Sequence, residues 1–238
     1  FQPILSAKNG EIIAYEALMR SQLATLKNPE MILRIAREEN KLEDVERICI
    51  FKSTETFDQL RKNKLVKEDA LLFINSIASV SLNDEDRERF HRYFSHIQSQ
   101  IVVEVTEEEN MSEEALIRKR ETKGFSGMFA LDDYGSGYNT EINLLNLSPK
   151  YIKIDLTIVR NIDKDFDKQQ LVSNIVEYAH QREGYIIAEG IETKEELLKV
   201  LELGVDYLQG YYLSYPQLNP QEVSNESIKT IENYWKKR

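Results

Sequence analysis

The sequence predicts an α/β protein, a TIM-type (β/α)8 barrel modified by an antiparallel strand near its N-terminus. Short apolar runs alternate with longer segments whose apolar residues recur at helical spacing. Strands separated by helical crossovers must pair in parallel, because such a connection returns the chain to the same end of the sheet. Seven or eight of these units within 238 residues favour a closed barrel. A doubly wound open sheet is the alternative, although no G-x-G-x-x-G follows the first strand.

The expected strands are short and apolar, and they cover residues 12–18, 70–75, 101–105, 128–131, 151–154 and 185–188, with a brief one at Tyr207. A further apolar run at residues 4–6 is followed by Asn9-Gly10, a dipeptide typical of tight hairpin turns. We therefore expect residues 4–6 and 12–18 to form a hairpin, which supplies the antiparallel pair.

The expected helices cover residues 29–62 as two helices, 83–98, 112–123, 166–183, 193–203 and 220–236. Chemical signals mark several of their boundaries. Asn83 precedes three acidic residues that suit the positive start of a helix, and Thr193 and Glu196 have the spacing of a capping box. Glycines stand where three of the helices are expected to end, at positions 124, 184 and 204.

Composition and charge exclude several classes of protein. Hydrophobic residues make up 41% of the chain and charged residues 30%, whereas glycines number 9 and prolines 5. This composition excludes collagen, low-complexity disorder and a turn-dense all-β protein. A net charge of −10 disfavours binding to polymeric nucleic acid and to anionic lipid. We therefore expect neither nucleic-acid binding nor direct contact between this domain and a membrane.

The single cysteine and the first residue bear on the setting of the chain. Cys49 cannot close an intramolecular disulfide, which is typical of a reduced, cytoplasmic protein. No apolar run reaches the roughly 18 residues that a membrane helix requires. Because the chain opens with Phe1 rather than Met, we expect residues 1–238 to be one domain excised from a longer protein, whose other parts, a membrane anchor included, stay unknown.

Nearly every expected strand ends in a residue able to bind a cation or a phosphate, and these residues are Glu16, Asn75, Glu104, Asp132, Asp133, Lys153, Asp155 and Glu189. In a parallel barrel the strand ends meet at the C-terminal mouth, where barrel enzymes have their active sites. One such acid is usually a solvated loop residue, but six converging carboxylates repel one another unless a cation lies among them. The set contains no His or Cys, which favours Mg²⁺ or Mn²⁺ over zinc.

Two features of this set allow more than one interpretation. Asp132 and Asp133 precede a Gly-containing turn at residues 134–138, which alone is a weak phosphate-loop signal. The turn is more typical of a mobile loop that holds two adjacent acids, because one carboxylate can bridge two metal ions while its neighbour completes the second. Lys153 either neutralises Asp155 or orients water or phosphate.

Several strand ends belong to short motifs that occur together in one known family. Glu16-Ala17-Leu18-Met19-Arg20 matches E-A-L-x-R, and Gln2-Pro3-Ile4 matches the Q-P-I upstream of it. The later motifs follow in order: Asn75, Glu104-Val105-Thr106-Glu107, Asp132-Asp133-Tyr134-Gly135-Ser136-Gly137-Tyr138, Lys153-Ile154-Asp155, Ala188-Glu189-Gly190-Ile191-Glu192-Thr193 and Gln209-Gly210-Tyr211. By this series, essentially the whole chain resembles an EAL domain, the bacterial family of cyclic di-GMP phosphodiesterases.

The resemblance implies a role for each matched residue. It implies two Mg²⁺ or Mn²⁺ ions, the first held by Glu16, Asn75, Glu104 and Asp132 and the second by Asp132, Asp133 and Glu189. It implies that Lys153 positions the attacking water, with Glu189 beside it, and that Glu107 braces the loop that carries Asp133. The residues expected to meet the substrate or its supporting shell are Gln2, Leu18, Arg20, Glu192 and Gln209.

The activity that the resemblance implies is hydrolysis of one phosphodiester bond of cyclic di-GMP to linear pGpG by a two-metal mechanism. We expect cyclic di-GMP as the partner, a homodimer, and inhibition by Ca²⁺.

The alternative function is a receptor module that binds cyclic di-GMP without cleaving it. Such a module should have lost acids or Lys153, and neither loss is seen. A third class, an interaction domain that kept only the fold, has no reason to retain so many carboxylates. Asn139-Thr140-Glu141 and Tyr215 depart from the family pattern, at positions that the resemblance relates to base and phosphate contacts and not to the metals.

Overall fold

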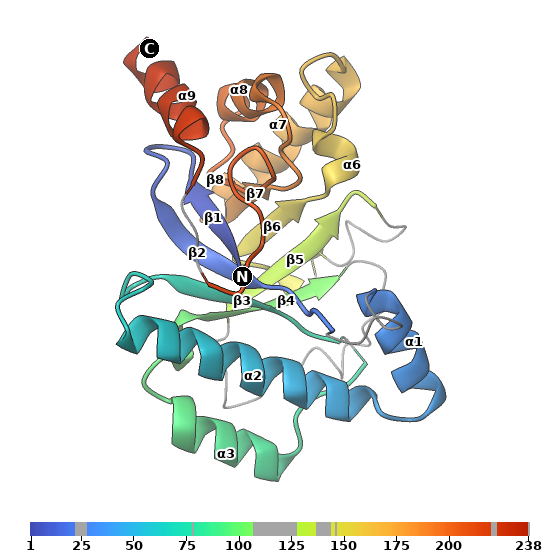
Figure 1. Ribbon diagram of the computed structural model, residues 1–238. Helices are drawn as coiled ribbons and strands as arrows, with labels where there is room; N and C mark the ends of the chain where they lie inside the picture. Colours follow the sequence, from blue (N-terminus) through green and yellow to red (C-terminus); the bar gives the residue numbers. More distant parts are fainter. Residues whose placement is uncertain are drawn as a thin grey trace.

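The computed structural model describes residues 1–21, 28–77, 79–106, 128–136, 144–145, 147–219 and 223–237, and within these the strands close into one barrel (Figure 1). The strands are joined edge to edge in sequence order. They are β1 (Gln2–Ser6), β2 (Ile12–Ala17), β3 (Leu71–Asn75), β4 (Ile101–Thr106), β5 (Met128–Tyr134), β6 (Tyr151–Ile154), β7 (Tyr185–Ala188) and β8 (Tyr207–Leu208). The predicted (β/α)8 barrel is thereby confirmed.

Strands β2 to β8 pair in parallel, each with the next, whereas β1 runs antiparallel to both of its neighbours, β2 and β8. The predicted hairpin of β1 and β2 is confirmed. The antiparallel pair with β8 was not predicted, and it follows because the one reversed strand closes the barrel. Gly10 makes the hairpin turn with φ +71°, and an added Cβ there would lie 2.8 Å from Ile228 Cδ1.

The reversal of β1 brings the start of the chain to the end of the barrel where the parallel strands finish. Gln2 is the register partner of Glu16, near the end of β2. Phe1 pairs with the segment after β8, since Gln217 N donates to Phe1 O at 2.9 Å and the terminal amino group donates to Gln217 O at 2.6 Å. Ala7, just past the other end of β1, accepts a hydrogen bond of 2.8 Å from Trp235 Nε1 in the last helix.

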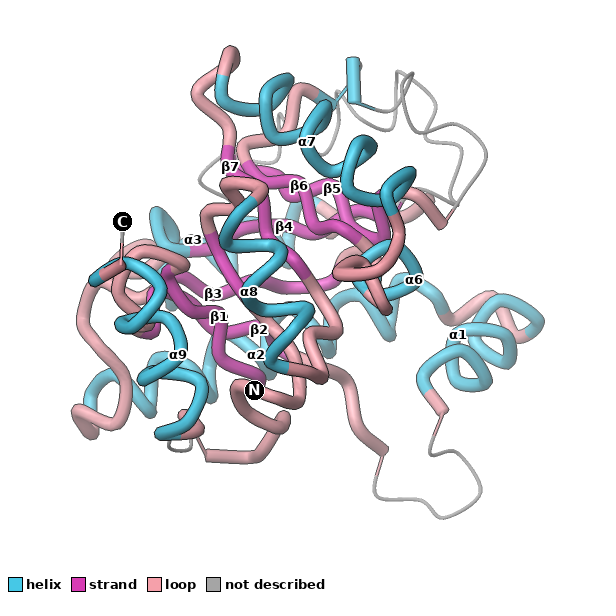
Figure 2. Tube along the Cα trace, turned by 90° about the horizontal axis from the view of Figure 1, so that it is seen from above, coloured by secondary structure: helices cyan, strands magenta, loops and turns pink. Residues whose placement is uncertain are grey.

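The helices surround the barrel, with α1 set apart to one side (Figure 2). They are α1 (Pro29–Glu38), α2 (Leu42–Lys62), α3 (Asp84–Phe94), a 3-10 turn (Gln98–Gln100), α6 (Leu156–Val159), α7 (Phe166–His180), α8 (Lys194–Glu202) and α9 (Asn225–Lys236). Helix α2 packs against β3 and α7 against β7, on opposite sides of the barrel (Figure 1). Among the described residues, no helix is long and apolar enough to cross a membrane.

The helix boundaries largely follow the capping signals. Asn83 Oδ1 accepts from Asp86 N, and Thr193 and Glu196 form the predicted capping box. The helix expected from residue 220 begins instead at Asn225, because Ser224 caps it by accepting from Ser227 N. The helix expected at residues 112–123 lies outside the described residues. Helix α6 was not predicted, and Asp155 caps its start.

A layer of apolar side chains fills the barrel interior: Ile4, Ala14, Phe73, Val102, Ala130, Tyr151 and Ile187. Tyr151 meets Phe73 edge-on, with ring centroids 5.1 Å apart, and stacks on Tyr185 at 5.7 Å. Tyr207 packs against the same layer, so it contributes to the wall rather than to the mouth. Because side chains alternate between the two faces of a strand, the positions two residues toward the mouth also face inward. Those positions are polar in every strand.

Candidate metal centre

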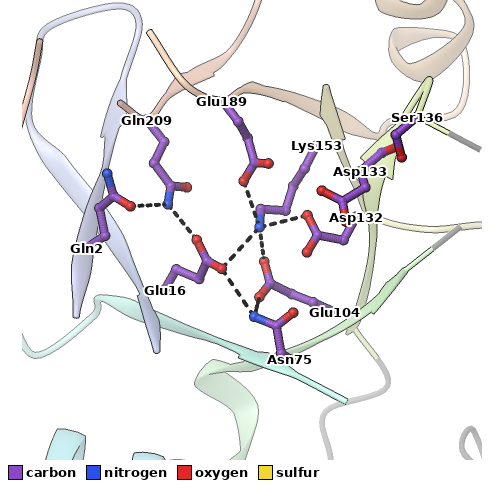
Figure 3. Close-up of polar contacts among 10 residues, drawn as sticks. All are labelled: Gln2, Glu16, Asn75, Glu104, Asp132, Asp133, Ser136, Lys153, Glu189 and Gln209. Atoms are coloured by element: carbon purple, nitrogen blue, oxygen red, sulfur yellow. Dashed lines mark hydrogen bonds and ion pairs between the residues drawn. The ribbon is translucent and has the colours of Figure 1, made fainter. Parts of the chain in front are cut away.

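Each strand directs one polar side chain into the mouth of the barrel, two positions beyond its residue in the apolar interior layer. In strand order they are Gln2, Glu16, Asn75, Glu104, Asp132, Lys153, Glu189 and Gln209 (Figure 3). Glu16, Asp132 and Lys153 are buried, and Glu104 is 0% exposed. Buried charges of one sign are costly unless opposite charge lies among them. The packing of the barrel therefore creates a strongly acidic, largely buried centre.

Lys153 lies among these acids. Its Nζ is 2.5 Å from Glu104 Oε1, 2.8 Å from Glu189 Oε1, 2.9 Å from Asp132 Oδ1 and 3.6 Å from Glu16 Oε1. Burial opposes the charged form of Lys153, but the carboxylates around it raise its pKa well above the usual range. Lys153 therefore carries a fixed positive charge at neutral pH.

The interpretation that Lys153 neutralises Asp155 is wrong. The Asp155 carboxylate caps α6 instead, since Oδ1 accepts a hydrogen bond of 2.8 Å from Thr157 N and another from the Thr157 hydroxyl. Lys153 points into the barrel from β6, whereas Asp155 is the first residue after that strand. The lysine is thus paired with the acids of the mouth rather than with its neighbour in sequence.

One lysine does not balance the acids. Burial raises the pKa of Glu104 and of Glu189 well above the usual range, although Lys153 opposes the shift, and it raises the pKa of Asp132 as well. Glu104 Oε1 and Asp132 Oδ1 are buried, and among the described residues the cation that contacts them is the single ammonium group of Lys153. Several buried carboxylates that share one ammonium group are suited to binding a divalent cation.

The carboxylates form two groups of three, each able to hold a metal ion. One group is Glu16, Glu104 and Asp132, and the other is Asp132, Asp133 and Glu189. Within each group, one ligand atom from each residue lies within 4.8 Å of the others. Asp132 belongs to both groups, so it can bridge two ions. All donors are oxygens, which favours Mg²⁺ or Mn²⁺ over softer metals.

Asp133 reaches the mouth through an irregularity of its strand. Between Leu131 and Tyr134 the register of β5 with β6 shifts, so that two residues of β5 oppose Lys153 alone. Asp133 has φ +56°, a left-handed conformation that few residues other than Gly, Asn and Asp adopt readily. Strand alternation would turn Asp133 away from the barrel, and the bulge instead brings it beside Asp132. Burial and the adjacent Asp132 raise the pKa of Asp133 to about 7.

Asn75 and Gln209 contact acids of the first group, and Gln2 contacts Gln209. Asn75 Nδ2 donates to Glu16 Oε1 at 3.2 Å and to Glu104 Oε2 at 3.0 Å. Gln209 Nε2 donates to Glu16 Oε2 at 2.5 Å and to Gln2 Oε1 at 3.2 Å, and both glutamines are buried. Gln209 therefore lies between Gln2 and Glu16, and the predicted role of the two glutamines, in the supporting shell or in substrate contact, stays a prediction.

The other predicted residues lie apart from the acidic centre or outside the described residues. Leu18 is half-buried, and Arg20 is exposed after β2 with its guanidinium donating to Met19 O at 2.8 Å. Glu192 forms a two-bond ion pair with Arg160, which lowers the pKa of the Glu192 carboxyl. Glu107 and residues 139–141 lie outside the described residues.

One buried acid that contacts the rim of the mouth was not predicted. Glu46 of α2 is 2% exposed and accepts hydrogen bonds from the two residues that follow Asn75. The sequence carries a signal that could have found it: Glu46 falls in the apolar stripe of α2 formed with Val45, Cys49 and Ile50, at helical spacing. An acid in such a stripe needs a buried partner.

Comparison with known protein families identifies the family of the chain, because residues 1–216 match the family described as EAL domain. The chain belongs to the EAL domain family. Among curated relatives of this EAL domain, the cyclic di-GMP phosphodiesterase PdeF of Escherichia coli K12 is 33% identical over 120 residues. That match covers 50% of this chain and 16% of PdeF, so the chain spans a small part of the relative's length.

Solved structures of EAL proteins share the barrel. A standalone EAL protein from Vibrio cholerae O395, in a c-di-GMP bound form, superposes with a TM-score of 0.77 at 24% identity over 95% of each chain. BlrP1 of Klebsiella pneumoniae, in a calcium and cy-diGMP complex, superposes with a TM-score of 0.75 at 24% identity over 93% of this chain and 56% of BlrP1. BlrP1 has also been solved in a manganese and cy-diGMP complex. At this identity, the likeness establishes the fold of the EAL domain described above.

Proposed function

We propose that this EAL domain hydrolyses one phosphodiester bond of cyclic di-GMP and releases linear pGpG. The observation that carries the proposal is the pair of three-carboxylate groups that share Asp132 around the buried, charged Lys153. The proposal is also supported by the membership of the family, since PdeF is a cyclic di-GMP phosphodiesterase and two EAL proteins of the same fold bind the cyclic dinucleotide.

We assign the first metal position to Glu16, Asn75, Glu104 and Asp132, and the second to Asp132, Asp133 and Glu189. The oxygen-only donor set and the burial of its carboxylates support this assignment. Two Mg²⁺ or Mn²⁺ ions bound there would polarise the phosphodiester and lower the pKa of the attacking water. The opposite charge of the ions would also lower the pKa values of the carboxylates, which burial raises.

Lys153 would position the attacking water and stabilise the negative charge of the phosphate as the ribose 3′-oxygen leaves. Its raised pKa favours the protonated side chain, which suits Lys153 to stabilising negative charge rather than to accepting a proton. Gln209 and Gln2 would keep Glu16 in the orientation that binding requires, through the hydrogen bonds that link the three residues.

The proposal is tested by incubating the protein with cyclic di-GMP and Mg²⁺ or Mn²⁺ and resolving linear pGpG by liquid chromatography. Asp132→Asn should abolish the product, whereas Glu43→Gln, at an exposed acid of α2, should not change it. Binding of cyclic di-GMP without cleavage, with either ion, would establish the alternative function of a receptor. Neither binding nor cleavage would refute both functions.

We also propose that the domain forms a homodimer. Three large apolar side chains of α6 and α7 support this, since Leu156 is 47% exposed, Phe166 74% and Leu171 40%. Light scattering at micromolar concentration tests the proposal, and a monomer at every concentration would refute it.

A further inference from the structure

We propose that Glu46 is a positioning residue for the first metal position, because its buried carboxylate fixes the turn that follows Asn75. The proposal deepens the function proposed above and rests on it, since it assigns a purpose to a residue outside the mouth and outside the matched motifs. It concerns how the protein holds Asn75 and not any contact between Glu46 and the ion.

The carboxylate of Glu46 binds the two residues immediately after Asn75, one with each oxygen. Ser76 Oγ donates to Glu46 Oε1 at 2.5 Å, and Ile77 N donates to Glu46 Oε2 at 2.9 Å. Ser76 N donates in turn to Glu104 O at 3.0 Å, which extends the pairing of β3 with β4 by one residue. The turn is therefore tied on one side to the strand that carries Glu104 and on the other to α2.

A buried carboxylate at this position of α2 costs free energy that an apolar side chain would not cost. Glu46 shares the buried stripe of α2 with Ile50 and is 2% exposed. Removing a carboxylate from water costs free energy, and a well-packed apolar side chain of similar volume is often as stabilising as a buried polar pair. Packing alone therefore does not account for an acid here, whereas fixing the adjacent turn does.

Among the described residues, few other contacts fix the side chain of Asn75. Asn75 is exposed at the end of β3, and its side chain bonds only to Glu16 and Glu104 among the contacts described, both of them acids of the candidate centre. Helix α2 also reaches the loop after β2, where Cys49 Sγ lies 3.8 Å from Met19 Sδ. Helix α2 thus contacts the segments that follow two neighbouring strands of the centre, β2 and β3.

Loss of the Glu46 carboxylate should weaken metal binding rather than abolish folding. Groups that orient the ligands of a metal without touching it typically change metal affinity 10- to 100-fold when they are removed. In the Glu46→Gln variant, the amide oxygen can still accept from Ile77 N while the amide nitrogen donates to Ser76 Oγ. The conservative variant should therefore keep the turn in place, whereas Glu46→Ala should release it.

The test is a calorimetric titration of the whole chain with Mn²⁺, in parallel with urea unfolding in chelator. We expect Glu46→Ala to weaken Mn²⁺ binding about tenfold or more, and Glu46→Gln to remain within about threefold of the unsubstituted chain. Glu43→Ala, at an exposed acid on the same helix, is the matched control and should change nothing. Ser76→Ala removes one of the two hydrogen bonds described above and should give a smaller loss of affinity, which keeps the test available if Glu46→Ala does not fold.

Unchanged Mn²⁺ affinity in Glu46→Ala or Ser76→Ala, with a loss of stability in chelator alone, would show that Glu46 is merely structural. A loss of affinity in Glu46→Gln as large as in Glu46→Ala would also overturn the proposal, since charge and not the turn would then be responsible. If the unsubstituted chain binds Mn²⁺ but does not cleave cyclic di-GMP, the proposed function fails while the binding data still decide the role of Glu46. If it binds no Mn²⁺, both proposals fail.

Discussion

Replacing Asp132 by Asn should make the protein more stable without metal and less stable with it. In the metal-free protein, burial raises the pKa of Asp132, so its charged form destabilises the folded state, by about 1.4 kcal/mol for each pKa unit. Asn removes that charge and gives up one ion pair, of 2.9 Å, while Lys153 keeps its contacts with Glu104 and Glu189. We therefore expect a net gain in the free energy of unfolding at pH 8.

The sign of this gain depends on pH in a defined way. When folding raises the pKa of a carboxyl, the folded protein loses stability as the pH rises above the ordinary pKa of that carboxyl. The reason is that the unfolded state then releases the proton freely, whereas the folded state does not. The advantage of Asn should thus be present at pH 8 and disappear toward pH 4. Where Mn²⁺ is at 100 times its dissociation constant, each site should stabilise the unsubstituted protein by about 2.7 kcal/mol, and the variant, which lacks the shared ligand, should gain far less.

Urea unfolding in chelator and in Mn²⁺, at pH 8 and pH 5, measures both effects, with Glu43→Gln as the control at an exposed acid. The reasoning would be refuted by a variant that is less stable than the unsubstituted protein by more than about 2 kcal/mol in chelator, the cost typical of a lost buried contact. It would equally be refuted if Mn²⁺ stabilised the variant as much as the unsubstituted protein.

Four further predictions concern the same centre. Lys153→Ala should slow single-turnover cleavage far more than it weakens binding of cyclic di-GMP, and Lys153→Arg should not restore the rate; a loss of binding alone would make Lys153 a substrate anchor. Because burial and Asp132 raise the pKa of Asp133 to about 7, the metal-free protein should lose stability as the pH rises from about 4 to 7, and Asp133→Asn should flatten this dependence in urea unfolding. Ca²⁺ should support binding of cyclic di-GMP but not hydrolysis, since its bonds of about 2.3–2.6 Å are longer than the 2.0–2.1 Å of Mg²⁺; pGpG formed with Ca²⁺ as the sole divalent ion would contradict the mechanism. Glu107→Ala should lose activity that excess metal partly restores, and an unchanged metal dependence would make Glu107 an ordinary surface acid.

Most of the centre could be predicted from the sequence because strand alternation determines it. Glu16, Glu104 and Lys153 each stand two positions beyond an apolar residue of the barrel interior, in strands too short to leave their direction in doubt. A short apolar run that ends in a polar residue therefore indicates both the strand and the side of the sheet. Parallel pairing then brings the polar ends together.

The contribution of Asp133 could not be derived from alternation, which places it on the outer face of β5. Its position depends on a left-handed backbone and a shifted register, and these arise from how β5 and β6 fit together in the closed barrel. The family resemblance assigned Asp133 to the second metal position without supplying that physical reason.

Contacts between segments far apart in the sequence were the second feature of the centre that could not be predicted. Gln209 and Glu16 are 193 residues apart in the sequence, and their hydrogen bond exists because the reversed β1 joins β8 to β2. The partners of Glu46 lie 30 and 31 residues away, in a turn whose placement depends on the packing of α2 against β3. Sequence spacing could mark Glu46 as an unusual acid in an apolar stripe, but it could not identify what the acid binds.

The pairing of Phe1 with Gln217 has a practical consequence for handling the protein. Because β1 enters the barrel from the mouth, a purification tag attached at residue 1 would emerge one residue from Gln2, which is hydrogen-bonded to Gln209. Histidines in such a tag could reach the acidic centre and compete for Mn²⁺, which would distort any measurement of metal affinity. Helix α9 meets Ala7 at the opposite end of β1, so a tag placed after α9 leaves the barrel on the far side. Titrations are best made with the second arrangement.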